Sequence, residues 1–209
     1  MVMIMLVDDH AIVRMGIKQA VAKWPGIVVA AEAATAQEAL DLALSKELDI
    51  VVLDIGMPGR GGLEVLKSLR ALKPKLKFVM LSMYPEEQYA IRCFKDGAGA
   101  YVTKDSPPEE LVKAIRAVAE GRRYITQSLG QQMAGLVLDT SSRPIHELLS
   151  DREFQVLVKI GAGKRVNEIA EELSLSPKTV STYRTRVLEK LGMENSAQLI
   201  KFVIQEGLV

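Results

Sequence analysis

The sequence predicts an α/β domain with a parallel sheet, followed by a small domain made only of helices. Three observations support this prediction. Five short apolar runs alternate with amphipathic helical patterns over about the first 120 residues. A polar stretch then interrupts the alternation, and four helical patterns without a strand pattern follow it. The length of 209 residues lets each of two domains bury its own core.

The five apolar runs are expected to be strands buried on both faces, because their successive residues are mostly apolar. The runs cover Met3–Val7, Ile27–Ala31, Ile50–Leu53, Phe78–Leu81 and Ala100–Val102. Strand–helix units of this size, repeated five times, predict a doubly wound sheet with helices on both faces.

Helical patterns lie between these runs. Apolar residues recur three and four positions apart over residues 12–21 and again over residues 63–72. The last helix of the domain is expected after Pro107-Pro108, with Glu109-Glu110 in its first turn. Proline and acidic residues both suit a helix N-terminus.

A linker and four further helices are expected in the rest of the chain. Residues 127–138 could form one helix, although two glycines weaken the pattern, and residues 139–144 have a linker composition. The four helices cover Asp151–Ile160, Asn167–Leu173, Pro177–Leu191 and Ser196–Gln205. The predicted divisions are therefore a first domain over 1–122, a linker over 123–145 and a second domain over 146–209.

Composition excludes several classes of protein. A net charge of +1 argues against a tail that coats nucleic acid, but it permits a local basic face. One cysteine, Cys93, rules out an internal disulfide framework and a Cys-rich metal site. The apolar start, Met1 to Val7, is too short to span a membrane and lacks the basic residues of a signal peptide. We therefore expect a soluble protein that stays inside the cell.

Polar residues follow four of the five predicted strands, at the edge of an open α/β sheet where ligands bind. They are Asp8-Asp9, Asp54, Ser82 and Thr103-Lys104. Three carboxylates favour Mg²⁺, and a metal, a hydroxyl and an ammonium together can stabilise a transferring phosphoryl group. Asp54 is the candidate nucleophile for an aspartyl-phosphate, because it stands alone at the end of the central strand. Asp8 and Asp9 form the pair suited to the metal.

Each of these residues also has a simpler interpretation. An aspartate after a strand is most often a turn or helix cap, Ser82 could be a cap, and Lys104 could be a solvated lysine. Their joint occurrence at four strand ends of one sheet favours a site. His10, beside the acidic pair, is expected to be a polar residue at a helix start rather than a ligand of Mg²⁺.

The stretches LVDDHAIVRMGI, VVLDIGMPGRGGLEVL, VMLSMY and GAGAYVTKD resemble the receiver domain of bacterial two-component response regulators, which has a flavodoxin-like fold with a five-stranded parallel sheet. The resemblance covers roughly residues 3–120. It implies that Asp8, Asp9, Asp54 and the backbone carbonyl of Gly56 hold Mg²⁺. It also implies that Asp54 accepts a phosphoryl group from a partner histidine kinase or phosphotransfer protein.

The same resemblance gives roles to three further residues. Lys104 would pair with the phosphoryl group, Ser82 would donate a hydrogen bond to it, and Tyr101 would rotate inward when that bond forms. Only the resemblance favours this role for Tyr101, because an aromatic residue in a short strand is often simply a packing residue.

Two other functions compete for this domain. Haloacid-dehalogenase-type phosphatases also use a strand-end aspartate, but they need a second acid two residues on, where this chain has Gly56. A phosphatase or phosphotransferase acting on a small substrate is therefore disfavoured. An interaction scaffold that keeps the receiver fold is the other alternative, and the retained acids, Ser82 and Lys104 argue against it.

Helix-turn-helix spacing appears in the second domain, where a short helix, a turn and a longer helix span 167–191. Ser176 is a natural N-cap and Pro177 suits the first helical position. Residues 174–188 contain three basic residues and no acid, so one side of the helix could meet phosphates and base edges. Lys164 and Arg165 could clamp the DNA backbone. A solvated basic face on a helical bundle is the alternative.

Residues 149–199 resemble the LuxR/NarL-type DNA-binding domain, in pieces such as LSDRE at 149–153 and the TV pair at 179–180. The resemblance implies base contacts from Lys178, Ser181, Thr182 and Arg184, with Thr179 and Arg186 near the backbone. Arg165-Val166-Asn167 and Tyr183 depart from the common family residues. These departures affect which DNA sequence is recognised rather than the fold.

The order of receiver, linker and four-helix domain is that of NarL/FixJ-type response regulators. The resemblance implies a cytoplasmic transcription regulator that is not an enzyme, has no membrane partner, binds double-stranded DNA and forms a homodimer when active. Residues 146–209 contain nine Lys+Arg and nine Asp+Glu. A DNA-binding domain with so little excess charge is expected to depend on dimerisation for its affinity.

Overall fold

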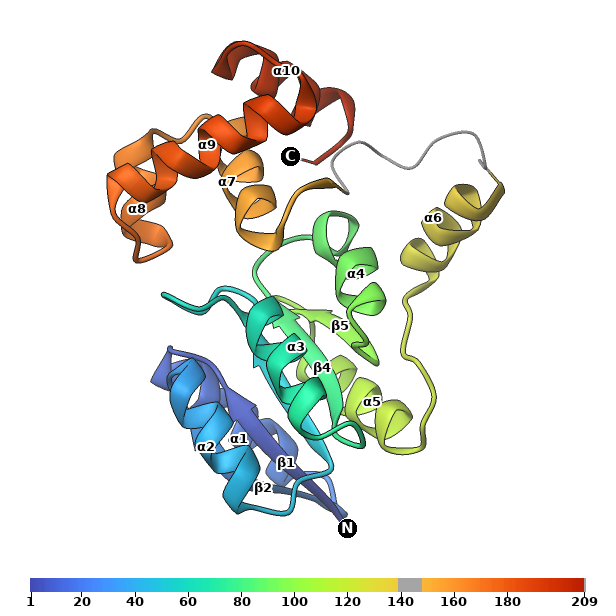
Figure 1. Cartoon of the computed structure of the whole chain (residues 1–209). Coiled ribbons are helices and arrows are strands. Elements are labelled where there is room, and N and C mark those ends of the chain that lie inside the picture. The colour runs from blue at the N-terminus through green and yellow to red at the C-terminus, as the bar shows by residue number, and fades with distance from the viewer. Residues whose placement is uncertain (139–147, 209) are drawn as a thin grey trace. The chain divides into compact units, whose positions relative to one another are not determined.

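The computed structural model describes residues 1–138 and 148–208 and divides into two compact units, Met1–Met133 and Ala134–Val209 (Figure 1). The division falls inside the segment 123–145 that the sequence marks as a linker. Each unit has its own architecture.

The first unit is built on a five-stranded parallel sheet, as predicted. Its strands are β1 (Val2–Val7), β2 (Ile27–Ala33), β3 (Ile50–Asp54), β4 (Lys77–Ser82) and β5 (Ala100–Thr103). They lie in the order β2-β1-β3-β4-β5, and every neighbouring pair is parallel. Each predicted apolar run lies inside one of these strands. The order reverses between β1 and β3, which is where open α/β sheets bind ligands.

β2 departs most from the expectation of burial on both faces. β3 is buried throughout, but β2 has three half-buried residues in its centre and an exposed Glu32. β2 is an edge strand, so it has a neighbour on one side only. The hydrophobicity of the β2 residues could not predict their partial exposure, because the order of the strands decides which strand lies at the edge of the sheet.

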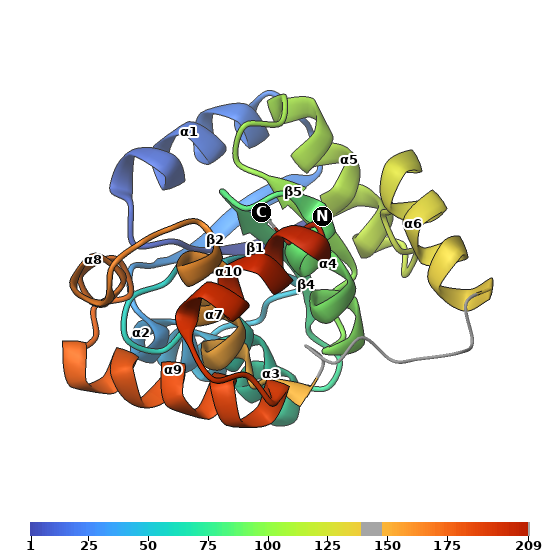
Figure 2. The same cartoon turned by 90° about the horizontal axis from the view of Figure 1, so that it is seen from above.

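Helices cover both faces of the sheet, which confirms the doubly wound prediction. They are α1 (Ala11–Ala22), α2 (Ala36–Ser45), α3 (Gly62–Leu72), α4 (Glu86–Lys95) and α5 (Pro108–Ala119). α1 and α5 pack on one face, where Ile17 and Ile115 join strand residues such as Ile4 in one apolar core. The view from above shows α2, α3 and α4 on the opposite face (Figure 2). α5 begins with Pro108 at its first position and two acids in its first turn.

The expected helix after the first unit's last strand–helix pair is present as α6 (Gln127–Leu138). Residues 139–144, predicted as a linker, lie outside the described residues. None of the described helices is long and apolar enough to cross a lipid bilayer.

The second unit contains α7 (Asp151–Gly161), α8 (Val166–Glu172), α9 (Pro177–Leu191) and α10 (Ser196–Gln205), each within one residue of its predicted bounds. α7 packs against α9 and α10. At Gly161 the approach to α10 is so close that a Cβ atom would lie 2.2 Å from Val203 Cγ1. The described part of this unit contains no strand.

The turn between α8 and α9 gives the helix-turn-helix its geometry. Ser174 adopts a left-handed conformation with φ of 51°, which is uncommon for a residue other than glycine. Ser176 then caps α9, because its side chain accepts the Thr179 N–H at 3.0 Å, and Pro177 occupies the first helical position. The N-cap predicted from the sequence is therefore confirmed.

Candidate functional site

The acidic residues of the first unit meet at the end of β1 and β3. Val7 pairs with Leu53 in the sheet, so Asp8 and Asp54 leave adjacent strands at the same level. Both carboxylates are buried, with 1% and 3% of the residue exposed. Two carboxylates can remain buried in this way only if cations or hydrogen bonds compensate them.

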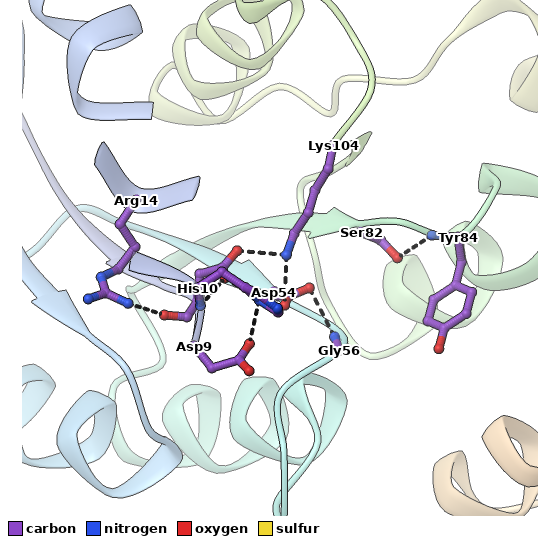
Figure 3. A network of polar contacts seen from close by, with 9 residues as sticks. Asp9, His10, Arg14, Asp54, Gly56, Ser82, Tyr84 and Lys104 are labelled. Atoms are coloured by element: carbon purple, nitrogen blue, oxygen red, sulfur yellow. Dashed lines mark hydrogen bonds and ion pairs between the residues drawn. The ribbon is translucent and has the colours of Figure 1, made fainter. Parts of the chain in front are cut away.

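Lys104 supplies the compensating charge. Its backbone N–H donates to the Ser82 carbonyl at 2.7 Å, which fixes the residue beside the end of β4. Its ammonium lies 2.7 Å from Asp8 Oδ2 and 2.9 Å from Asp54 Oδ2, and its side chain is only 8% exposed. Figure 3 shows this lysine between the two carboxylates. The structure thus brings together three of the residues predicted from separate strand ends.

Burial sets the electrostatics of this pocket. It raises the pKa of the Asp54 carboxyl, and the Lys104 ammonium and a 2.9 Å hydrogen bond from the Gly56 N–H offset this only in part. For Lys104, burial opposes the charged form, but the Asp54 and Asp8 carboxylates outweigh it and raise the pKa of the ammonium. The pocket therefore holds a positive lysine beside a carboxylate that would gain from further positive charge.

The same residues fit a divalent cation. Asp8, Asp9, His10 and Asp54 each place a ligand atom within 4.8 Å of the others. Asp9 Oδ1 is buried and accepts no hydrogen bond from the described residues, although His10 Nδ1 lies 3.0 Å away. Carboxylate oxygens are the donors that Mg²⁺ prefers. A hard cation would satisfy this buried oxygen.

His10 has a more specific position than the sequence indicated. It is the N-cap residue of α1, as expected, but its side chain makes no capping hydrogen bond. Its Nδ1 instead faces the carboxylates of Asp9 and Asp8, at 3.0 and 3.3 Å.

Ser82 is the last residue of β4, and Tyr101 lies on the neighbouring strand β5, where it pairs with Met80. Ser82 is fully buried, and its Oγ accepts the Tyr84 N–H at 3.0 Å (Figure 3). Tyr101 is turned inward with 2% of its surface exposed, and its hydroxyl donates to the Tyr84 carbonyl at 2.8 Å. Burial raises the pKa of Tyr101 well above its usual value, so this hydroxyl keeps its proton. Both side chains therefore hold the backbone of Tyr84.

Two residues that position the pocket were missed by sequence reasoning. Arg14 of α1 donates from its guanidinium to the Asp8 carbonyl at 2.6 Å, and so fixes the end of β1 (Figure 3). Gly62 approaches β3 so closely that a Cβ atom would lie 2.0 Å from the Asp54 carbonyl oxygen. The glycine-rich run at 59–62 was a signal for such an approach, whereas a helix-start arginine carries no comparable signal.

The second unit presents a polar face on α9. Lys178, Ser181, Thr182 and Arg186 are exposed, whereas Arg184 and Thr179 are half-buried. Thr179 Oγ1 shares a hydrogen bond with Ser176, and Thr182 Oγ1 donates to the Lys178 carbonyl. Arg184 therefore exposes only part of its side chain.

The two basic residues before α8 differ from each other. The Lys164 ammonium forms an ion pair with the Glu172 carboxylate, which also binds Lys159. Arg165 is exposed, and its N–H donates to the Glu168 carboxylate at 2.7 Å. Part of the positive charge that the sequence assigned to this turn is therefore neutralised within the unit.

Comparison with known proteins agrees with both units. The family model of the response regulator receiver domain matches residues 4–116, and that of bacterial regulatory proteins of the luxR family matches residues 147–203. The response regulator UvrY of Escherichia coli strain K12 is 37% identical over 209 residues, which cover 100% of this chain and 96% of UvrY.

Solved structures show the same relationship. A LuxR-family two-component response regulator from Aurantimonas sp. is 40% identical, with a TM-score of 0.61 over 66% of this chain and 98% of that one. A structure described as two RcsB dimers bound to two parallel DNAs is 25% identical, with a TM-score of 0.60 over 97% of each chain.

A receiver sheet with its acidic pocket and a helix-turn-helix unit are thus joined in one chain that aligns end to end with a known response regulator. The relatives are regulators of transcription, not enzymes, which disfavours the phosphotransferase alternative. The chain belongs to the two-component response regulators of the NarL/FixJ type, in which a receiver domain is joined to a LuxR-type DNA-binding domain.

Proposed function

We propose that Asp54 accepts a phosphoryl group from a partner histidine kinase or phosphotransfer protein. The observation that carries this proposal is the burial of Asp54 with Lys104 at 2.9 Å, at the switch point of the sheet. An Asp54 oxygen forms a bond to phosphorus while the phosphorus–nitrogen bond of a phosphohistidine breaks, and the imidazole is the leaving group. No other nucleophilic side chain is needed for this transfer.

The neighbouring residues stabilise the phosphoryl group. It carries about two negative charges at neutral pH, and the Lys104 ammonium provides a point charge for its oxygens. Ser82 stands at the end of β4, and its hydroxyl donates a hydrogen bond to a phosphoryl oxygen. The Tyr101 hydroxyl ties the Ser82–Tyr84 loop to β5 through its bond to the Tyr84 carbonyl.

Asp8, Asp9, Asp54 and the backbone carbonyl of Gly56 are the proposed ligands of Mg²⁺. The cluster of carboxylates and the buried, unsatisfied Asp9 oxygen support this set. When bound, Mg²⁺ neutralises charge on the phosphoryl oxygens. His10 is left outside the set, because imidazole is a poor ligand for this hard cation.

The second unit is proposed to bind double-stranded DNA through α9 in the major groove. Lys178, Ser181, Thr182 and Arg184 contact bases, whereas Thr179, Arg186, Lys164 and Arg165 contact the backbone. The exposure of Lys178 and Arg186 on a face without acids between 174 and 188 supports this.

The active form is proposed to be a homodimer in the cytoplasm. Nine basic and nine acidic residues over 146–209 leave one copy with little net attraction for DNA. The RcsB structure of dimers on DNA supports the same arrangement here. A two-fold dimer predicts half-sites about 10 bp apart or a multiple of that spacing.

Phosphorylation can be tested with a small labelled phosphodonor and Mg²⁺. Asp54→Ala is expected to abolish labelling, whereas Asp105→Ala, which removes an exposed acid beside Lys104, is expected to keep it. Labelling of Asp54→Ala at the wild-type level would remove Asp54 as the acceptor. Selection of bound DNA from a random library, with and without phosphodonor, then identifies the target.

A further inference from the structure

The chain that follows α5 runs along the outer edge of β5. β5 is the last strand of the sheet, so this edge has backbone groups available for pairing. The Tyr124 N–H donates to the Gly99 carbonyl at 3.0 Å, and Tyr124 forms an isolated parallel bridge with Ala100. We call Tyr124–Ser128 the linker-start segment; it ends in the first turn of α6.

Side chains of the linker-start segment bind carboxylates of α4 and α5. Thr126 Oγ1 lies 2.6 and 2.7 Å from the two oxygens of Glu86, and the Ser128 hydroxyl also donates to Glu86. The Tyr124 hydroxyl donates to the Glu110 carboxylate. Burial of the ring, together with this carboxylate, raises the pKa of Tyr124 to about 12, so the donor proton is retained at neutral pH.

Thr126 connects Glu86 to the start of α6. The Leu129 N–H donates to Thr126 Oγ1 at 3.2 Å, which is the hydrogen bond of a helix N-cap. Leu129 itself is buried, with 2% exposed. One hydroxyl therefore caps α6 and binds Glu86, so the first turn of α6 is tied to the start of α4.

Glu86 stands at the end of the loop that begins with Ser82. It is the first residue of α4, four residues after Ser82. Between them, the Tyr84 N–H is held by Ser82 Oγ and the Tyr84 carbonyl by the Tyr101 hydroxyl. The two ends of one short loop thus contact the phosphoryl pocket and the linker-start segment.

We propose that Glu86 is a releasable anchor of the linker. Glu86 binds the linker-start segment while Asp54 is unmodified. Its hydrogen bonds with Thr126 and Ser128 break when Ser82 binds a phosphoryl group on Asp54 and the loop after Ser82 moves toward that group. The segment cannot follow this movement, because Tyr124 is attached to Gly99, the residue before β5, and to α5 through Glu110. Hydrogen bonds weaken steeply once length and angle depart from their optimum. This proposal depends on phosphorylation of Asp54.

Hydrogen–deuterium exchange of the full chain tests the anchor. Peptides covering 122–130 are compared with and without acetyl phosphate and Mg²⁺, and intact mass reports the phosphoryl group. In wild type, exchange at Leu129 is expected to be slow and to rise roughly tenfold on phosphorylation, whereas exchange at Tyr124, whose N–H stays bonded to Gly99, should remain slow. Glu86→Ala should exchange fast without phosphodonor and change little when it is added.

Matched variants distinguish loss of the Glu86 hydrogen bonds from a general loss of structure. Glu87→Ala removes an exposed acid from the same first turn of α4 and should behave as wild type. Thr126→Ala combined with Ser128→Ala removes the donors and should reproduce Glu86→Ala. If Glu86→Ala and the double variant both fold and keep slow exchange, Glu86 is not an anchor.

Different results would overturn the phosphorylation of Asp54 and the release of the linker-start segment by Glu86. A chain that carries the phosphoryl group but shows unchanged exchange at 122–130 overturns release and leaves phosphorylation of Asp54 intact. A wild-type chain that never gains the mass of a phosphoryl group overturns the phosphorylation proposal and, with it, release. In that case the exchange of Glu86→Ala still decides whether Glu86 holds the segment.

Discussion

The ammonium of Lys104 lies 2.9 Å from the Asp54 carboxylate, and the same ammonium lies 2.7 Å from Asp8. One buried cation therefore serves two buried carboxylates, with the acid Asp9 beside them. Burial is the main cause of the raised pKa of Asp54, and the Asp8 carboxylate adds to it, although a lysine is in contact with the carboxyl. It also gives the pocket its capacity for a further cation.

Removal of Asp54 and removal of Lys104 should change stability in opposite directions. Folding raises the pKa of the Asp54 carboxyl, so its ionised form lowers the free energy of unfolding at a pH above both its folded and unfolded pKa. Folding also raises the pKa of Lys104, so its ammonium adds to the free energy of unfolding at a pH below its unfolded pKa. At neutral pH, Asp54→Asn should therefore raise the free energy of unfolding. Lys104→Met should lower it, on the order of 3 kcal/mol. Urea denaturation with a chelator present measures both, and equal losses in the two variants would contradict this account.

Gly62→Ala should damage both the fold and the pocket. The added Cβ would lie 2.0 Å from the Asp54 carbonyl oxygen, which is backbone and can yield only if β3 shifts. We expect a loss of roughly 2 kcal/mol and slower labelling of Asp54. Gly16→Ala is the control, because a Cβ there meets nothing within 4 Å and alanine favours the α1 helix by about 0.5–1 kcal/mol. Loss of stability in both variants would show that the close approach at Gly62 is not the cause.

The second unit should lose stability as the pH falls into the acid range. Burial opposes ionisation of Glu153, but the Lys190 ammonium at 2.6 Å and the Ser150 N–H at 2.8 Å hold the pKa of Glu153 below its ordinary 4.5. The contribution of ionised Glu153 to stability is complete at a pH above its unfolded pKa, and it is lost as the pH falls through its folded pKa. Calorimetric melting from about pH 6 to about pH 3 should show a flatter curve for Glu153→Gln. Glu189→Gln, at an exposed position on α9, should follow wild type. Identical curves for all three proteins would exclude this role of Glu153.

Arg186 and Lys178 should affect DNA binding differently. Arg186→Ala removes a proposed backbone contact, so affinity should fall to a similar extent for all sequences, and the salt slope should decrease by about 1. Lys178→Ala should cost about 1–3 kcal/mol on the selected sequence and less on others. Lys201→Ala, an exposed residue of α10, is the control. An unchanged salt slope in Arg186→Ala would place that residue away from the phosphates.

The strands, the helices and the pocket could be predicted because their signals are local. Apolar runs mark the strands, and the polar residue after each run marks the sheet edge where Asp8, Asp54 and Lys104 meet. Contacts between distant side chains have no such signal. Glu86 and Thr126 are 40 residues apart, and neither stands in a recognisable motif.

Other features that the sequence did not predict also depend on contacts between distant parts of the chain. The half-exposure of β2 follows from strand order, and the ion pair of Lys164 with Glu172 joins a residue before α8 to the last residue of α8. Ser174 adopts a left-handed conformation, which a serine in the sequence does not predict. Each depends on tertiary geometry rather than on the pattern of neighbouring residues.

The most direct test of the account is the affinity for a selected DNA sequence, measured for the full chain with and without phosphodonor and Mg²⁺. We predict that phosphorylation tightens wild-type binding roughly tenfold or more, and that Asp54→Ala binds with the same low affinity in both conditions. Equal tightening in Asp54→Ala, or unchanged binding by a wild-type chain shown to carry the phosphoryl group, would contradict control of DNA binding by Asp54.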